Sequence, residues 1–200
     1  MYLVASFNGI TPEKKQTPST RTPRIGMTPA IQDVSVNDPK FLKYTETDST
    51  GQNFIHRIAA DSKPSLYSKF YDIKMQFPNY LVAFNAKDKE GRTPLHIASM
   101  KGSTANVHDL LYLGVDVDSK DVNGATPLSY ASQSGNTIVV EELLKKGANP
   151  NHMDYKGRSV LQYASDANKV DVVAVLRKSG ATGRPTFKPI SPFKKRKLEN

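Results

Sequence analysis

The sequence predicts an all-α fold, a solenoid of about four helix-turn-helix repeats with short β-hairpin loops, flanked by two disordered tails. Two observations predict it. The stretch from Asp88 to Gly114 recurs 33 residues later, at 121–147, and once more at 154–180. Each copy keeps the same landmarks in register, with aspartate at 88, 121 and 154, a turn glycine at 91, 124 and 157, and a closing glycine at 114, 147 and 180. A fixed period of this length indicates units that bury apolar area only by stacking on one another.

The composition suits a short array with tails. Of the 200 residues, 38% are hydrophobic, which is enough for a modest core but not for one that runs the full length. No run approaches the ~18 apolar residues of a membrane span, so we expect none. The absence of cysteine excludes disulfides, thiolate catalysis and Cys-ligated zinc.

The net charge of +9 is concentrated at the C-terminus. Residues 184–200 carry six Lys/Arg against one Asp/Glu, whereas residues 48–183 carry sixteen against fourteen. The repeats are therefore nearly neutral, which argues against a broad nucleic-acid-binding face on them.

Residues 1–47 are predicted to be a disordered Thr/Pro-rich tail, because they lack periodicity and the apolar area that would offset the entropy of ordering. Four Thr-Pro pairs begin at Thr11, Thr17, Thr22 and Thr28. They fit either a solvated proline-rich tail or a cluster of sites for proline-directed kinases, where each phosphate would add close to two negative charges. Near the end of this tail, an apolar group could pack onto the first repeat: Phe41, Leu42 and Tyr44.

Residues 48–87 are predicted to form a diverged first repeat with seven inserted residues. Four of its residues match the next repeat at an offset of 40, namely Asp48, Gly51, Ile55 and His56. The second helix of this repeat is expected to run from Ser65 to Phe77, with one apolar face formed by Leu66, Phe70, Ile73 and Phe77. Six aromatic residues lie between Tyr67 and Phe84, and they either cap the end of the array or form a partner-binding patch.

Residues 88–120, 121–153 and 154–183 are predicted to be three regular repeats, the last of them a C-terminal cap. The pairs Thr93-Pro94 and Thr126-Pro127 place a hydroxyl cap before a proline at the first helical position. These helices are expected to end in the left-handed conformation at Gly102, Gly135 and, as the next best residue, Asn168. In the last repeat an arginine, Arg177, stands where the first regular repeat has Leu111, and a charge there suits a terminal repeat with a solvated outer face.

The motif TPLH at Thr93–His96, together with the 33-residue period, resembles the ankyrin repeat family over 88–180 and more weakly over 48–87. The resemblance implies an L-shaped stack in which hairpins project from pairs of helices. It also implies that His96 and its counterpart His56 are structural. Ser129 and Gln162 replace the histidine in the later repeats, and they can hydrogen-bond but are poor metal ligands.

No Gly-rich phosphate loop, nucleophile elbow, pair of catalytic acids or metal-spaced cluster occurs in the sequence, so we expect neither catalysis nor a cofactor. In the ankyrin repeat family, partners bind to variable positions at the hairpin tips and on the inner face of the first helix of each repeat. By register these positions are Lys89, Glu90, Arg92, Met100, Lys101, Val122, Asn123, Ala125, Gln133, Ser134, Tyr155, Lys156, Arg158, Asp166 and Ala167. The mixture of charge, Met and Tyr is typical of a protein-protein surface, although solvated tips would vary in the same way.

Residues 184–200 are predicted to be a second disordered tail. Its run Lys194, Lys195, Arg196 and Lys197 resembles a single-cluster nuclear localisation signal. The alternatives are a nonspecific contact with nucleic acid or acidic lipid, or a solubilising tail. Ser191-Pro resembles a cyclin-dependent kinase site, and a phosphate there would oppose the positive run.

The sequence therefore predicts a noncatalytic, monomeric scaffold of the nucleus and cytoplasm that binds another protein and a nuclear import receptor, and no small-molecule substrate. The stretch Gly51–His56, followed by an insertion and then TPLH, resembles the first repeat of IκB-type inhibitors of Rel transcription factors. This resemblance implies control of a transcription factor. The alternative is an adaptor that binds nucleic acid or acidic membrane through its basic tail.

Overall fold

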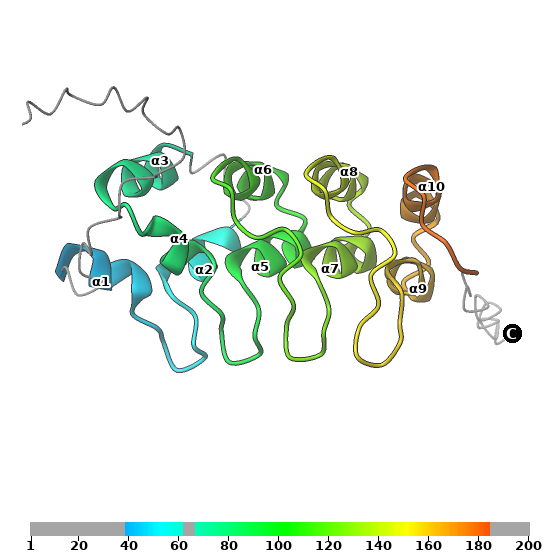
Figure 1. Ribbon diagram of the computed structural model, residues 1–200, viewed down its shortest axis with the longest axis horizontal. Coiled ribbons are helices and arrows are strands. Elements are labelled where there is room, and N and C mark those ends of the chain that lie inside the picture. The colour runs from blue at the N-terminus through cyan, green and yellow to red at the C-terminus, as the bar shows by residue number, and fades with distance from the viewer. Residues whose placement is uncertain (1–38, 62–66, 185–200) are drawn as a thin grey trace, which may run out of the picture. The chain divides into compact units, whose positions relative to one another are not determined.

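The computed structural model describes residues 39–61 and 67–184, which lie in one compact unit, 33–200; the other unit, 1–32, falls outside the described residues. The described residues form two rows of antiparallel helices (Figure 1). The inner row consists of α2 (Phe54–Ala59), α5 (Pro94–Lys101), α7 (Pro127–Ser134) and α9 (Val160–Asp166). The outer row consists of α3 (Tyr67–Gln76), α6 (Thr104–Tyr112), α8 (Thr137–Lys145) and α10 (Val170–Lys178). The array is thus the predicted all-α solenoid of four repeats.

Local signals set the short length of the inner helices. In α5, proline occupies the first turn, and Thr93 and His96 form a reciprocal capping box at the N-terminus. Gly102 ends the helix at φ 69°, in the left-handed region, and Asn168 takes the same role after α9 at φ 55°. Helices of seven to nine residues are marginal alone in water, so their stability depends on stacking.

The core repeats with the sequence. Leucines at the same position of α5, α7 and α9 are almost fully buried, and each is accompanied by a buried alanine that lets neighbouring inner helices approach closely: Leu95, Leu128, Leu161, Ala98, Ala131 and Ala164. The outer helices add a second layer of buried residues, Leu110, Leu143 and Leu176. Burying such side chains stabilises the fold by roughly 1.5–3 kcal/mol each.

An aspartate organises each hairpin loop. In the first regular repeat, Asp88 Oδ1 accepts the backbone N–H groups of Glu90 and Arg92, both at 2.9 Å. Asp121 and Asp154 repeat the pattern in the next two hairpins, and Asp48 does so in the first repeat. The turn glycine that follows has positive φ in all four loops, which only glycine adopts without strain.

The hairpins are also joined to one another along the array. The backbone N–H of Val122 donates to Glu90 O at 3.1 Å, and that of Tyr155 donates to Asn123 O at 2.9 Å. The loops differ from the prediction in one respect, because the described residues contain no regular strands, only isolated bridges between Thr47 and Asn53 and between Met153 and Ser159. The aspartate and the turn glycine shape these loops, and too few ladder bonds form to build a strand.

The N-terminal boundary of the array lies earlier than predicted. Residues 39–45, assigned to the disordered tail, form helix α1 (Pro39–Thr45). Phe41 is buried there, with its ring centroid 5.0 Å from that of Phe77, and Tyr44 packs edge-on against Phe54 and Phe77. The expectation that residues 1–47 are wholly disordered is therefore wrong at its end, because an aromatic cluster of tertiary origin stabilises a helix whose own sequence gives little signal.

The first repeat is capped by aromatic residues. Its second helix, predicted over 65–77, is α3, and Phe70, Ile73 and Phe77 are buried; Leu66 lies outside the described residues. A short helix that the sequence did not predict, α4 (Tyr80–Phe84), follows. It places the ring centroid of Phe84 5.2 Å from that of Phe70. The Tyr80 hydroxyl donates to Leu113 O at 3.0 Å, which ties α4 to the next repeat.

The last repeat ends the array with polar contacts. Arg177 donates to Ala181 O at 3.2 Å and to Gly183 O. Asn151 Oδ1 accepts the N–H of Thr182 at 2.8 Å, which holds the chain along the hairpin side as it leaves α10. The arginine thus satisfies backbone carbonyls of the segment that follows α10.

Candidate interaction surface

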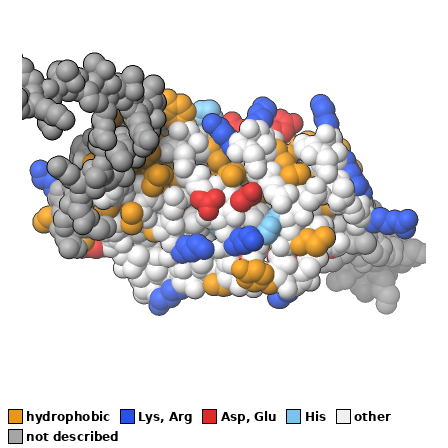
Figure 2. Space-filling model, in the orientation of Figure 1, with side chains coloured by type: hydrophobic (Ala, Val, Ile, Leu, Met, Phe, Trp, Pro, Cys, Tyr) orange, Lys and Arg blue, Asp and Glu red, His pale blue; other side chains and the backbone are white. Residues whose placement is uncertain are grey.

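Three large apolar side chains are exposed where neighbouring hairpins meet. Val122 is 60% exposed, Met153 60% and Tyr155 72%. Hydrophobic and basic side chains are interspersed along this edge of the molecule (Figure 2). We call this set the tip surface: Lys89, Lys120, Val122, Met153, Tyr155 and Lys156. Large apolar side chains gathered at an exposed edge are typical of interaction sites.

The Tyr155 ring is held in place although most of it faces solvent. Its backbone N–H is bonded to Asn123 O, and its ring lies against Gly124. A Cβ added at Gly124 would come within 2.8–2.9 Å of three ring carbons, so the close approach requires glycine. An aromatic side chain that is already ordered loses little entropy on binding, which favours it as an anchor.

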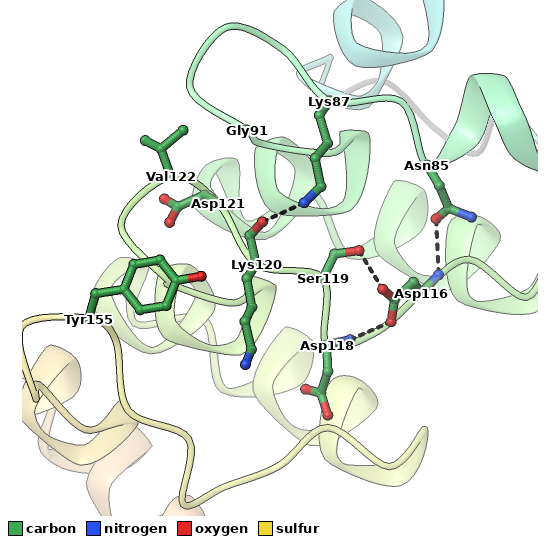
Figure 3. A pocket seen from close by; sticks show the side chains of 10 residues that line it. All are labelled: Asn85, Lys87, Gly91, Asp116, Asp118, Ser119, Lys120, Asp121, Val122 and Tyr155. Carbon is green, nitrogen blue, oxygen red and sulfur yellow. Dashed lines mark hydrogen bonds between the residues drawn. The ribbon is translucent and has the colours of Figure 1, made fainter.

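A hollow of about 840 Å³ adjoins the tip surface (Figure 3). Val122 and Tyr155 line one side of it. Asp116 and Asp118 line the other side, but both carboxylates already accept bonds: Asp116 from the Asp118 N–H and the Ser119 hydroxyl, and Asp118 from the Asn149 N–H. The Lys87 ammonium donates to Lys120 O at 2.8 Å.

Two predicted binding residues, Arg92 and Arg158, also bond the aspartates of their own hairpins. The Arg92 guanidinium bonds Asp88 Oδ2 at 2.9 Å and Glu90 at 2.7 Å, and only 19% of its side chain is exposed. The Arg158 Nε donates to Asp154 Oδ2 at 2.8 Å. Burial opposes ionisation of Asp88 and Asp154, but the N–H donors and the guanidinium outweigh it and hold the pKa of each carboxyl below its usual value.

The other predicted residues divide between two places. Four of them are exposed at the hairpins: Lys89, Glu90, Asn123 and Lys156. Asn123 and Lys156 directly follow Val122 and Tyr155, and Glu90 O accepts the Val122 N–H. Six others lie at the C-terminal ends of the inner helices, away from the hairpins: Met100 and Lys101 at α5, Gln133 and Ser134 at α7, and Asp166 and Ala167 at α9. Ala125 is buried. The predicted set is therefore not one continuous patch.

Sequence reasoning missed Lys87, Lys120 and Met153, which border the hairpins. A signal was present, because all three stand one residue before the repeated aspartate. The hairpin-tip positions that the family resemblance implies all follow that aspartate in sequence.

The two motif histidines are structural. His96 Nδ1 accepts the Thr93 N–H at 3.0 Å, and its Nε2 donates to Ala125 O at 3.2 Å in the next hairpin. Burial lowers the pKa of His96 to about 4, so the ring is neutral at pH 7. His56 links in the same way to Arg92 O at 2.9 Å, and burial lowers its pKa as well.

No cluster of three or more His, Asp or Glu side chains that could hold a metal occurs within residues 39–61 and 67–184. In the same ranges, no helix combines the length and the apolar character that crossing a bilayer would require. The predicted modification sites and the basic run lie outside the described residues: Thr11, Thr17, Thr22, Thr28, Ser191, Lys194, Lys195, Arg196 and Lys197.

A family model for ankyrin repeats, in three copies, matches residues 106–184. The match agrees with the stacked helix pairs and the projecting hairpins of the structure. The chain is an ankyrin-repeat protein. The matched segment starts inside α6, and the hairpin and capping box just before it follow the same pattern. No curated protein matches the chain.

Ankyrin repeats are generally noncatalytic interaction units, so these repeats form a protein-interaction scaffold and the partners of this chain are proteins. Stacked repeats suit this role, because the positions that recur in every repeat build the array and leave the exposed ones free to differ.

Proposed function

We propose that this ankyrin-repeat protein is a nucleocytoplasmic regulator that captures a protein partner on its tip surface, with a transcription factor as the partner class. The observation that carries the capture site is the ordered, 72% exposed ring of Tyr155 beside Val122. An aromatic anchor with an apolar neighbour and a lysine rim has the composition of an interface centre and its polar border.

The nuclear part of the proposal rests on the basic run at 194–197, within a segment that carries six Lys/Arg against one Asp/Glu. An import receptor recognises such a run as a cluster of positive charge. The transcription-factor class rests on the resemblance of Gly51–His56 to the first repeat of IκB-type inhibitors.

A second candidate function uses the basic tail directly, as a contact with nucleic acid or acidic membrane. The +5 balance of residues 184–200 favours it. Binding of this kind would weaken steeply with salt and would disappear when the tail is removed.

The test compares four proteins in a crosslinking pull-down from nuclear extract: the full chain, the chain without 184–200, Tyr155→Ala and Val170→Ala. The last variant is the matched control, because Val170 is also an exposed apolar residue, at 63%, but lies at the start of α10. We expect Tyr155→Ala to lose the captured partner and the other two variants to retain it.

A fluorescent fusion of the chain without 184–200 should leave the nucleus, while its partner capture stays unchanged. Retention of the partner by Tyr155→Ala and its loss on tail removal would contradict the proposal and support the second candidate. Inhibition of Rel-factor DNA binding by the full chain, relieved by Tyr155→Ala, tests the transcription-factor class.

A further inference from the structure

The outer row of helices carries the same hollow twice. One hollow lies between α6 and α8, and its lining includes Leu111 and Lys145. The other lies between α8 and α10, and its lining includes Leu144 and Lys178. Every lining residue of the first has a counterpart 33 residues later in the second: His108 and Glu141, Leu111 and Leu144, Glu142 and Val175, Lys145 and Lys178, Lys146 and Ser179. The repeat period therefore places equivalent hollows on the face away from the hairpins.

Three of these five pairs differ in residue type, and the pair Glu142 and Val175 is the one that exchanges a charged side chain for an apolar one. Between α6 and α8, Glu142 Oε1 lies 3.3 Å from His108 Nδ1, so a charged side chain crosses the space and leaves about 160 Å³. The second carboxylate oxygen, Oε2, is buried and has no hydrogen-bond partner in the described residues. Between α8 and α10, Val175 takes the place of Glu142, and the hollow widens to about 530 Å³.

We call the wider hollow the outer groove. Its floor is apolar, made of Leu144, Ala148, Pro150 and Val175. Its rim carries the exposed ammonium groups of Lys145 and Lys178 against one carboxylate, Glu141, and the neighbouring exposed residues Lys146 and Arg177 are also basic. Its volume falls in the range of roughly 300–1,000 Å³ that is usual for sites binding a compact group.

We propose that the outer groove is a second docking site, for an acidic peptide segment of a partner that inserts one bulky apolar side chain. The side chain would cover Leu144 and Val175, and flanking carboxylates would pair with Lys145 and Lys178. The basic rim selects an acidic occupant, since like charges across an interface are strongly unfavourable. The same rule disfavours the chain's own C-terminal segment, whose charge balance is six Lys/Arg against one Asp/Glu.

This site is separate from the tip surface, because it is built on the carboxyl ends of the outer helices rather than on the hairpins. The scaffold can therefore hold two segments at once, either from one partner or from two. Two linked contacts of this kind raise the overall affinity above that of either contact alone.

The experiment measures fluorescence anisotropy of a labelled glutamate peptide with a single central leucine, titrated with the full chain at low salt. We expect saturable binding that weakens about fivefold or more with Val175→Gln, which fills the hollow with a polar group, and further with Val175→Glu. Glutamate already stands at the equivalent position 142, so the neighbouring repeat shows that this residue type fits the helix surface.

Lys178→Glu is the second variant, since it changes an exposed residue and does not touch the core. Its matched control is Lys101→Glu, which makes the same charge change at the exposed end of α5 in the inner row of helices and should alter binding by less than about twofold. Tyr155→Ala should leave binding unchanged. Circular dichroism of each variant establishes that the array is folded.

Three results would overturn the proposal. The first is equal binding of a peptide with alanine in place of leucine, which would leave charge alone as the cause. The second is full binding by folded Val175→Glu. The third is loss of binding in Tyr155→Ala, which would move the peptide to the tip surface.

Discussion

At the scale of single residues, the second carboxylate oxygen of the repeated aspartate accepts hydrogen bonds from different donors in different repeats. Asp88 Oδ2 is held by Arg92, whereas Asp154 Oδ2 is held by both Arg158 and the Tyr163 hydroxyl. Asp121 has no arginine at the corresponding position, and its Oδ2 accepts the Tyr130 hydroxyl at 2.7 Å. At this aspartate the Tyr130 phenol therefore takes the place of the arginine as the donor to Oδ2.

Removing that phenol should cost more than removing its counterpart. We expect Tyr130→Phe to lower the free energy of unfolding by about 2 kcal/mol, because a buried carboxylate oxygen loses its donor. Tyr163→Phe should cost less than about 1 kcal/mol, since the Arg158 guanidinium still bonds Asp154. Urea denaturation of both variants measures the difference, and equal losses would show that Asp121 finds another donor.

At the scale of elements, no helix of the array is long enough to persist by itself, so each depends on its neighbours. Helix α1 is the extreme case. Its seven residues have one buried side chain, Phe41, which packs into the aromatic cluster of the first repeat. The end of the array is thus sealed by a helix that only packing stabilises.

Substitutions at two adjacent residues of α1 test whether its packing stabilises the end of the array. We expect Phe41→Ala to destabilise the protein by about 3 kcal/mol, because the aromatic cluster loses a fully packed ring. Leu42→Ala removes a side chain that is 37% exposed and should cost less than about 1 kcal/mol. Hydrogen exchange should show faster exchange of α2 and α3 in the first variant only. Similar behaviour of the two variants would mean that α1 does not cap the array.

At the scale of the whole molecule, two buried histidines connect successive repeats. His56 Nε2 donates to Arg92 O and His96 Nε2 donates to Ala125 O, so each ring joins one repeat to the hairpin of the next. Burial lowers the pKa of both rings below the usual value of 6.5. The coupling between repeats is therefore sensitive to acid.

Stability should fall as the pH drops from about 6.5 to about 4. In this window the unfolded chain binds protons on His56 and His96 more readily than the folded chain does, so protonation favours unfolding, by up to about 1.4 kcal/mol per pH unit for each ring. Asp88 and Asp154, whose pKa values are lowered, lose their contribution only below the usual carboxyl value of 3.8.

The measurement is urea denaturation at pH 7 and pH 5. His96→Gln, which introduces the residue found at position 162, should be less stable at pH 7 but should lose less between the two pH values. An unchanged difference in His96→Gln would show that this ring does not set the acid response.

Much of the fold could be predicted because its signals are local and repeated. The period, the Thr-Pro starts and the glycine ends act within a few residues, so the helices α5 to α10 follow from them. For the candidate site, the sequence predicted which residues are exposed but not which side chains bond to one another. Tyr155 and Val122 are exposed as expected, but Arg92 and Arg158 bond the hairpin aspartates, which spacing alone did not reveal. Whether Tyr155 and Val122 bind a partner stays a prediction.

The sequence by itself determined the repeat architecture of this protein, because each repeat carries its own caps, turns and apolar positions. Only the tertiary structure decided which variable residues are free. Helix α1, the placing of the Tyr155 ring on Gly124 and the outer groove opened by Val175 all arise between repeats. They depend on which side chains meet across a stacking distance, and a linear pattern does not contain that information.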